Sequence, residues 1–94
     1  TGVLATDPSD ASGTNAFDQR AGSWSGLMLD AAGIDAALFP EIVESTTVIG
    51  TVTAAAAAES GLIAGTPVVM GGGDGPMAAL GAGVVDSTSG AYAY

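Results

Sequence analysis

Apolar residues recur every three or four positions over residues 24–31, which is the spacing of one face of an α-helix. The apolar positions are Trp24, Leu27, Met28 and Ala31. Ser23 suits the N-cap of this helix and Gly33 suits its C-terminal end. We therefore predict an amphipathic helix of about ten residues that buries this face, with Trp24 in the core.

Two short runs rich in β-branched residues, "TVIGTV" (47–52) and "TPVVM" (66–70), predict strands. Thr53 suits the N-cap of a helix over Ala54–Ser60 that ends before Gly61. Pro76 suits the first turn of a second helix over residues 76–83.

Shorter elements complete the pattern. Residues 5–15 are rich in turn formers and predict a loop. A short strand is predicted after it, near Thr14–Asp18. Asp35 suits the cap of a single helical turn through Leu38, and "GAYAY" (90–94) suits the start of a strand, with Tyr92 and Tyr94 alternating with Ala.

Alternation of strands and helices predicts the α/β class, with a partly parallel sheet and flanking helices. Ninety-four residues form one small domain at most, and neither a repeat nor a linker divides residues 1–94. Thr1 is not an initiator methionine, so we expect the chain to be a piece of a longer protein. No stretch is long and apolar enough to span a membrane and no signal peptide opens the chain, so we expect a cytoplasmic protein.

Charge and missing residue types exclude several kinds of chemistry. Ten acidic residues face the single Arg20, and the net charge of −9 argues against binding to nucleic acid or to an anionic membrane. The chain has no His, Cys or Lys, which excludes the Ser-His-Asp triad, thiolate or imidazole zinc sites and Schiff-base chemistry. Any catalysis must use carboxylates, hydroxyls, backbone amides or Arg20.

The stretch "VVMGGGDGPMAALGAG" (68–83) surrounds one carboxylate, Asp74, with glycines. Asp74 follows a strand that we predict to be buried and precedes a helix, which is where open α/β sheets bind ligands. Gly71–Gly73 would let the chain turn sharply, with their amides facing the crevice. The pattern leaves two interpretations open, namely that Asp74 caps the helix or that it contacts a substrate.

Other motifs fail on their spacing. The glycine run lacks the Lys-Ser/Thr ending of a phosphate loop and the G-x-G-x-x-G pattern of a dinucleotide site. A calcium loop counted from Asp7 would place Ala11 at its fifth position and Asp18 at its twelfth, where a glutamate is needed, so we expect no metal site.

Several blocks in sequence carry a resemblance to a known family. "TDPSDASGTNAFDQRAGSWS", "LFPEIVESTTVIGTVT", "GLIAGTPVVMGGGDG" and "AALGAGVV" resemble, in order and spacing, the FGGY carbohydrate kinases, and among these the xylulokinases most. The resemblance runs from about Thr6 to Val85. It implies the later part of the sugar-binding N-terminal domain, a partial ribonuclease-H or actin-like fold with a mixed sheet.

The resemblance also implies a function. Asp74 matches the catalytic base of these kinases, which phosphorylate a sugar hydroxyl with ATP and Mg²⁺, here bound mainly outside the chain. The implied partners are a pentulose or related sugar or polyol and the rest of the kinase polypeptide, while a homodimer is left open. The isolated chain is expected to be inactive.

The substrate-binding candidates are Asp74, Gly75, Asp10 and Ser12. Many xylulokinases have Asn after the catalytic Asp, whereas this chain has Gly75 followed by Pro76, which puts xylulose in doubt. Asp10 and Ser12 lie in "SDASGT", which resembles a loop near the sugar cleft. The alternative function is that of a non-catalytic acidic α/β module that binds a partner or a small polar ligand.

Overall fold

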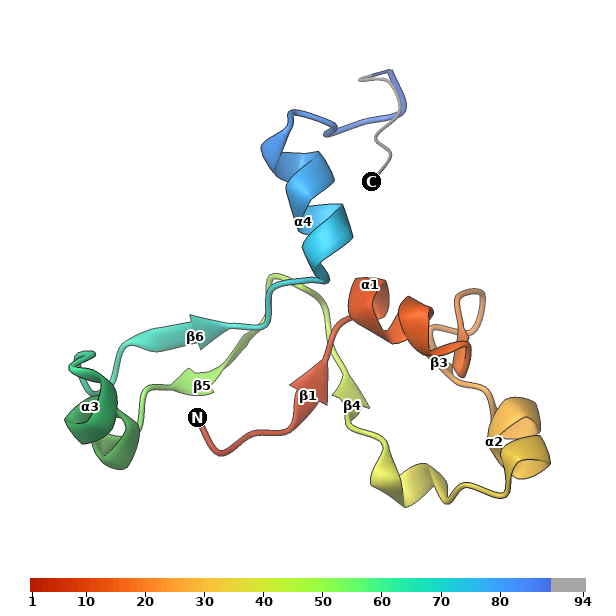
Figure 1. The fold of residues 1–94 in the computed structure, drawn as a ribbon, viewed down its shortest axis with the longest axis horizontal. Helices are drawn as coiled ribbons and strands as arrows, with labels where there is room; N and C mark the ends of the chain where they lie inside the picture. Colours follow the sequence, from red (N-terminus) through yellow and green to blue (C-terminus); the bar gives the residue numbers. More distant parts are fainter. Residues whose placement is uncertain (89–94) are drawn as a thin grey trace.

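The fold is built around a short parallel pair of strands. The computed structural model describes residues 1–88, and in it β1 (Ala5–Thr6) pairs in parallel with β4 (Glu41–Ile42). Helix α1 (Pro8–Ala11) follows β1 directly, and three arms extend from this centre (Figure 1). The arms carry α2, α3 and α4, and α4 rises beside α1.

The arm that ends in α3 agrees with the prediction closely. β5 (Val48–Thr51) and β6 (Pro67–Val69) form an antiparallel pair, and α3 (Ala54–Ser60) connects them. The Thr53 hydroxyl accepts a hydrogen bond from the Ala56 N–H at 3.2 Å, and Gly61 ends the helix in a left-handed conformation. β6 is not the buried strand that we predicted, because the side chain of Val69 is 52% exposed.

The arm of α2 (Gly26–Ala32) differs from the prediction at its start. Ser23–Trp24 form strand β3, which pairs with β2 (Phe17–Asp18), so the helix begins only after Ser25, which is its N-cap. The predicted burial of one helix face is wrong, because Leu27 is 80% exposed and Leu29 is the buried residue of α2. Gly33 ends the helix as predicted.

Trp24 is half-buried by aromatic neighbours. Its ring centroid lies 4.7 Å from that of Phe39, and Phe17 approaches it edge-on at 6.3 Å. The indole Nε1–H donates to the carbonyl oxygen of Pro40 at 2.8 Å. These contacts connect the β2–β3 hairpin to the segment that enters β4.

Two predictions near the ends of the chain need correction. Residues 5–15 are not a loop, because they contain β1, α1 and the 3₁₀ turn η1 (Ser12–Thr14). Helix α4 (Asp74–Gly81) begins two residues before the predicted start at Pro76. The single turn η2 (Ala36–Leu38), capped by Asp35, is confirmed, and the strand predicted over 90–94 lies outside the described residues.

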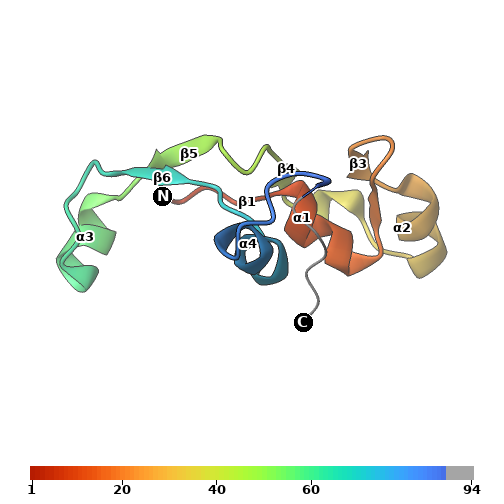
Figure 2. The ribbon, with the colours of Figure 1, turned by 90° about the horizontal axis from the view of Figure 1, so that it is seen from above.

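The α/β class with parallel and antiparallel pairing is confirmed, although the strands are spread over three two-stranded sheets. Figure 2 shows how flat the described chain is, with extents of 42 × 39 × 20 Å. Its radius of gyration is 16.1 Å. A compact domain of this length would have about 12 Å. Few apolar side chains are buried among the described residues (Ala11, Leu29 and Val52), so the chain has many uncovered apolar faces.

Candidate active site

Asp74 is the first residue of α4, and the N-cap of that helix is Gly73. The interpretation of Asp74 as the N-cap is therefore wrong, although a carboxylate in the first helical turn is still favoured by the helix dipole. Its Oδ1 accepts a hydrogen bond from the Gly75 N–H at 2.8 Å. No other group among residues 1–88 bonds to this exposed side chain, so Oδ2 is available to a hydroxyl donor.

The glycine run before Asp74 is held at both ends. The Gly71 N–H donates to the carbonyl oxygen of Ser45 at 2.9 Å, and the Gly73 N–H donates to Ser9 Oγ at 2.9 Å. We predicted that these amides would face a crevice, and that prediction is wrong for both of them. Their partners come from distant segments of the chain, which fix the path of the run.

At two of the three positions the backbone requires glycine. Gly71 has φ of +75°, a conformation that other residues adopt at a cost of roughly 1–2 kcal/mol. A Cβ at Gly72 would lie 2.8 Å from Met77 Cε and 2.9 Å from Ser9 Oγ. The run therefore needs glycine for its turn and for its close approach to α1.

The Asp7 carboxylate lies at the centre of these contacts and is only 1% exposed. Its Oδ1 accepts from the Asp10 N–H at 3.1 Å, which caps α1. Its Oδ2 accepts from the Ser9 N–H at 3.0 Å and from the hydroxyls of Ser9 and Ser45, both at 2.7 Å. Asp7 thus joins α1, the segment before β5 and, through Ser9, the glycine run.

Hydrogen bonding decides the protonation state of Asp7. Burial by itself raises its pKa, but the hydroxyls of Ser9 and Ser45 and the backbone N–H groups of Asp10 and Ser9 together outweigh burial. They lower the pKa from 3.8 to about 2, so Asp7 is an anion at neutral pH.

Sequence reasoning missed this role, although a signal was present. Asp7 precedes a proline, and an Asp followed by Pro at the first helical position is typical of a helix N-terminus. Counting Asp7 as a turn former concealed the helix that it caps. Its contact with Ser45, 38 residues away, has no local signal at all.

The other predicted substrate-binding residues are Asp10, Gly75 and Ser12, and they do not all lie at the glycine run. Asp10 is exposed and lies beside the glycine run, since a Cβ at Gly73 would be 3.7 Å from Asp10 Oδ1. Gly75 is buried at the start of α4. The structure thus places Asp10 against Gly73, the residue before Asp74, and Gly75 directly after Asp74.

Ser12 lies in a separate place, where its hydroxyl donates to the Ser9 carbonyl oxygen at 2.7 Å. It lines an open pocket of about 530 Å³ whose wall contains neither Asp74 nor Gly75. The remaining lining residues are Pro8, Ser9, Phe17, Gln19, Gly22 and Glu44. Ser12 and Asp74 share neither a hydrogen bond nor the lining of this pocket.

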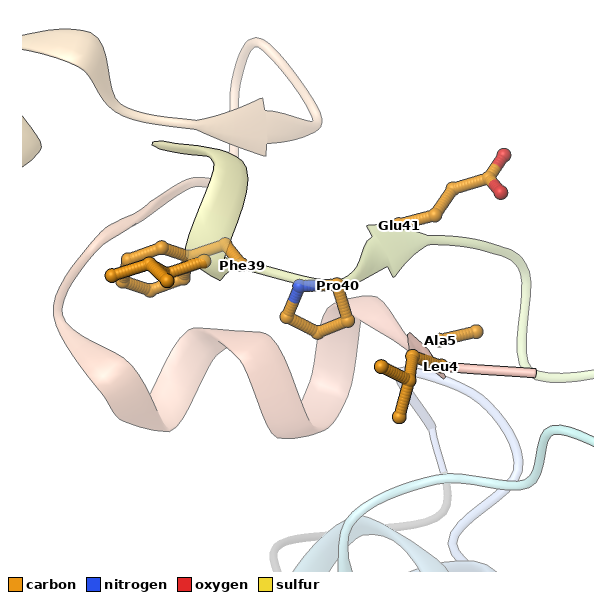
Figure 3. Close-up of a pocket in the computed structure, with 6 residues that line it drawn as sticks. Leu4, Ala5, Phe39, Pro40 and Glu41 are labelled. Carbon is orange, nitrogen blue, oxygen red and sulfur yellow. The ribbon is translucent and has the colours of Figure 1, made fainter. Parts of the chain in front are cut away.

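A second pocket of about 360 Å³ lies beside the β1–β4 pair and contains none of the candidate residues. Leu4, Phe39 and Pro40 form much of its wall, and Figure 3 shows the Glu41 side chain extending away from Leu4. A mostly apolar wall without convergent polar groups offers little to a sugar. Elsewhere in residues 1–88, no group of three or more acidic side chains is placed to hold a metal ion.

In the part of the chain that the structure covers, no helix has the length and apolar character that crossing a membrane requires.

Comparison with known proteins gives one consistent result. Residues 1–81 match the model of the FGGY family of carbohydrate kinases, N-terminal domain. The chain is 50% identical over 84 residues to "Autoinducer-2 kinase" of Enterobacter sp. (strain 638), and 49% identical over 84 residues to "Autoinducer-2 kinase" of Yersinia enterocolitica. These alignments cover 89% of this chain and 16% of each relative.

A solved structure supports the same fold. The ligand-bound xylulose kinase of Lactobacillus acidophilus superimposes with a TM-score of 0.85 at 29% identity. The match covers 93% of this chain and 18% of that protein, so the chain spans about a sixth of the length of its relatives. The chain belongs to the FGGY family of carbohydrate kinases.

Proposed function

We propose that the chain is the later part of the sugar-binding domain of an ATP-dependent sugar kinase, in which Asp74 is the general base. The observation that carries the proposal is the placement of Asp74. Its carboxylate starts a helix, keeps Oδ2 available and follows a backbone run that two distant segments hold in place. Membership of a carbohydrate kinase family supports this assignment.

The chemistry needs a carboxylate in this position. A sugar hydroxyl is a weak nucleophile at neutral pH because it holds its proton. As its oxygen bonds to the γ-phosphorus of ATP and the bond from that phosphorus to the ADP oxygen breaks, the proton passes to Asp74. A carboxylate within hydrogen-bond reach of the hydroxyl can accept this proton directly.

The acceptor in this proposal is a pentulose or a related sugar or polyol. Gly75 has no side chain to bond a sugar hydroxyl, so other contacts must select the substrate. One of these is proposed to be Asp10, which lies beside Gly73, and Ser12 is proposed to shape the cleft wall from its separate pocket. The names of the relatives point to xylulose and autoinducer-2 as the two acceptors to test first.

The nucleotide is proposed to bind mainly outside this chain. The phosphates of ATP need positively charged groups around them, and Mg²⁺ needs oxygen ligands such as carboxylates. The one cationic side chain here is Arg20, and residues 1–88 contain no cluster of three acidic side chains that could hold a metal ion. The remainder of a longer polypeptide would supply them and would cover the exposed apolar faces.

Replacing Asp74 by Asn in the complete kinase tests the assignment. Asn keeps the volume of the side chain and can still bond a hydroxyl, but it cannot accept the proton. Turnover should fall about 10²- to 10⁴-fold while sugar affinity changes only a few-fold. Glu59→Gln, an equivalent change on exposed α3, is the matched control and should keep wild-type turnover. An Asp74→Asn variant that retains more than about a tenth of the turnover would contradict the proposal.

A further inference from the structure

Asp7 is a buried carboxylate that the proposed proton transfer does not use. We propose that Asp7 is a positioning residue, which acts through Ser9 and Ser45 to fix the glycine run that presents Asp74. The inference rests on the proposed role of Asp74 and adds to it the group that holds the base in place. It is carried by the hydrogen bonds that converge on one oxygen atom, Asp7 Oδ2.

The hydrogen bond to Asp7 orients the Ser9 hydroxyl. Because this hydroxyl donates its proton to Asp7 at 2.7 Å, a lone pair of Ser9 Oγ is left to accept from the Gly73 N–H at 2.9 Å. Gly73 is also the N-cap of α4, and its carbonyl oxygen accepts from the Met77 N–H at 3.0 Å. Asp7 therefore determines how the residue immediately before Asp74 is held.

The other end of the glycine run is held through Ser45. The carbonyl oxygen of Ser45 accepts from the Gly71 N–H, and the hydroxyl of the same Ser45 donates to Asp7. Both anchors of the glycine run thus lead to Asp7 Oδ2. Three consecutive glycines have the greatest backbone freedom of any sequence, so they keep a single path only where such contacts fix them.

Capping of α1 does not account for these contacts. The cap uses the backbone N–H groups of Ser9 and Asp10, and a helix N-terminus gains its stabilisation from those groups. Ser45 lies outside α1, and Ser9 links the carboxylate to a glycine 64 residues further along the chain. The two hydroxyl contacts therefore serve the junction between α1, the segment before β5 and α4, which meet where Figure 1 places α1 beside α4.

Ser9→Ala in the complete kinase tests the inference, because it removes the link to Gly73 but leaves the side chain of Asp7 in place. A displacement of about 1 Å in a catalytic group can cost about 100-fold in rate, so we expect kcat to fall about 10- to 100-fold. The KM for the sugar should stay within about threefold. The acceptor is whichever of xylulose and autoinducer-2 the wild type phosphorylates.

Thr53→Ala is the matched control. It removes the cap of α3, which lies in another arm, and should lower stability by a similar amount while keeping wild-type kcat. The decisive comparison places Ser9→Ala in the Asp74→Asn background, where it should lower turnover less than twofold because the group that it positions is already lost. A purely structural role would lower turnover equally in both backgrounds.

A readout without turnover completes the test. Amide hydrogen exchange over residues 71–73 in the complete protein should become at least tenfold faster in Ser9→Ala and in Asp7→Asn, and should be unchanged in Thr53→Ala. If Ser9→Ala does not fold, Ser45→Ala replaces it in the same comparison, because it removes the hydroxyl that bonds to Asp7 and keeps the carbonyl oxygen that accepts from Gly71. Unchanged exchange, or a kcat equal to that of the wild type, overturns the inference. If Asp74→Asn keeps the kcat of the wild type, the proposed function is wrong. The rate of amide hydrogen exchange over residues 71–73 then still shows whether Asp7 fixes the glycine run.

Discussion

The low pKa of Asp7 predicts that the stability of this region depends on pH through a single side chain. The perturbation is Asp7→Asn in the complete protein, which keeps the shape of the side chain but removes its charge. In the folded protein the Asp7 carboxyl has a pKa of about 2 rather than 3.8. A group whose pKa is lowered by folding stabilises the folded state above its unfolded pKa, and this contribution disappears as the pH falls through the folded pKa.

The magnitude follows from the two pKa values. A difference of nearly two pKa units corresponds to about 2.5 kcal/mol of stability above pH 5. About half of this should remain at pH 3, and little should remain below pH 2. Because Asn does not titrate, the difference in unfolding free energy between wild type and Asp7→Asn should shrink over this range as the pH falls.

Urea unfolding at pH 6, 4 and 3 measures this difference. Asp30→Asn, an exposed change on α2, is the control and should alter stability by less than about 0.5 kcal/mol at each pH. A difference between wild type and Asp7→Asn that stays constant from pH 6 to pH 3 would refute the reasoning, because the carboxylate would then not be held by its hydrogen bonds. A difference that grows as the pH falls would have the wrong sign.

Three further predictions concern the chain and its glycine run. Gly72→Ala in the complete kinase should lower the free energy of unfolding by about 1–3 kcal/mol and should also lower turnover. The added Cβ would lie 2.9 Å from Ser9 Oγ, an atom that is held by Asp7. A variant as stable as the wild type in urea would contradict this. The purified 94-residue chain should show no sugar phosphorylation above an Asp74→Asn control in a coupled assay, since it has no lysine or phosphate loop to place ATP. The same chain should show no sharp thermal transition above about 60 °C as a monomer, because its short sheets have open edges and its apolar side chains are exposed, and calorimetry checks this.

Local signals predicted the elements whose ends are set by their own residues. Thr53 and Gly61 define α3 because a hydroxyl cap and a left-handed glycine act within a few residues of the helix. Asp35 defines η2 in the same way. The predicted N-cap of α2, Ser23, is wrong for a reason that lies outside that segment. Ser23–Trp24 pair with β2, so the helix begins after Ser25, which is its N-cap.

Burial could not be predicted, because it depends on contacts that the sequence of one segment does not contain. Leu27 and Leu29 are alike in chemistry, yet the first is exposed and the second is buried. Glycine and proline predicted a helix directly after Asp74, although the helix begins at Asp74 itself, and the role of Asp74 remains a prediction. The residue that holds its segment, Asp7, could not be found in this way, because Ser45 and Gly73 are distant in sequence.

The charges around Asp74 bear on what the rest of the kinase must contribute. Asp7 is an anion in the network that holds the glycine run, and the Asp10 carboxylate lies beside Gly73. The single cationic side chain, Arg20, follows β2 in the β2–β3 hairpin, in the arm that leads to α2. Negative charge beside the glycine run repels the phosphates of ATP. We therefore expect the groups that neutralise the transferred phosphoryl, a metal ion and basic side chains, to approach this corner from outside the chain. The proposed base and the phosphate site would then belong to different parts of the enzyme.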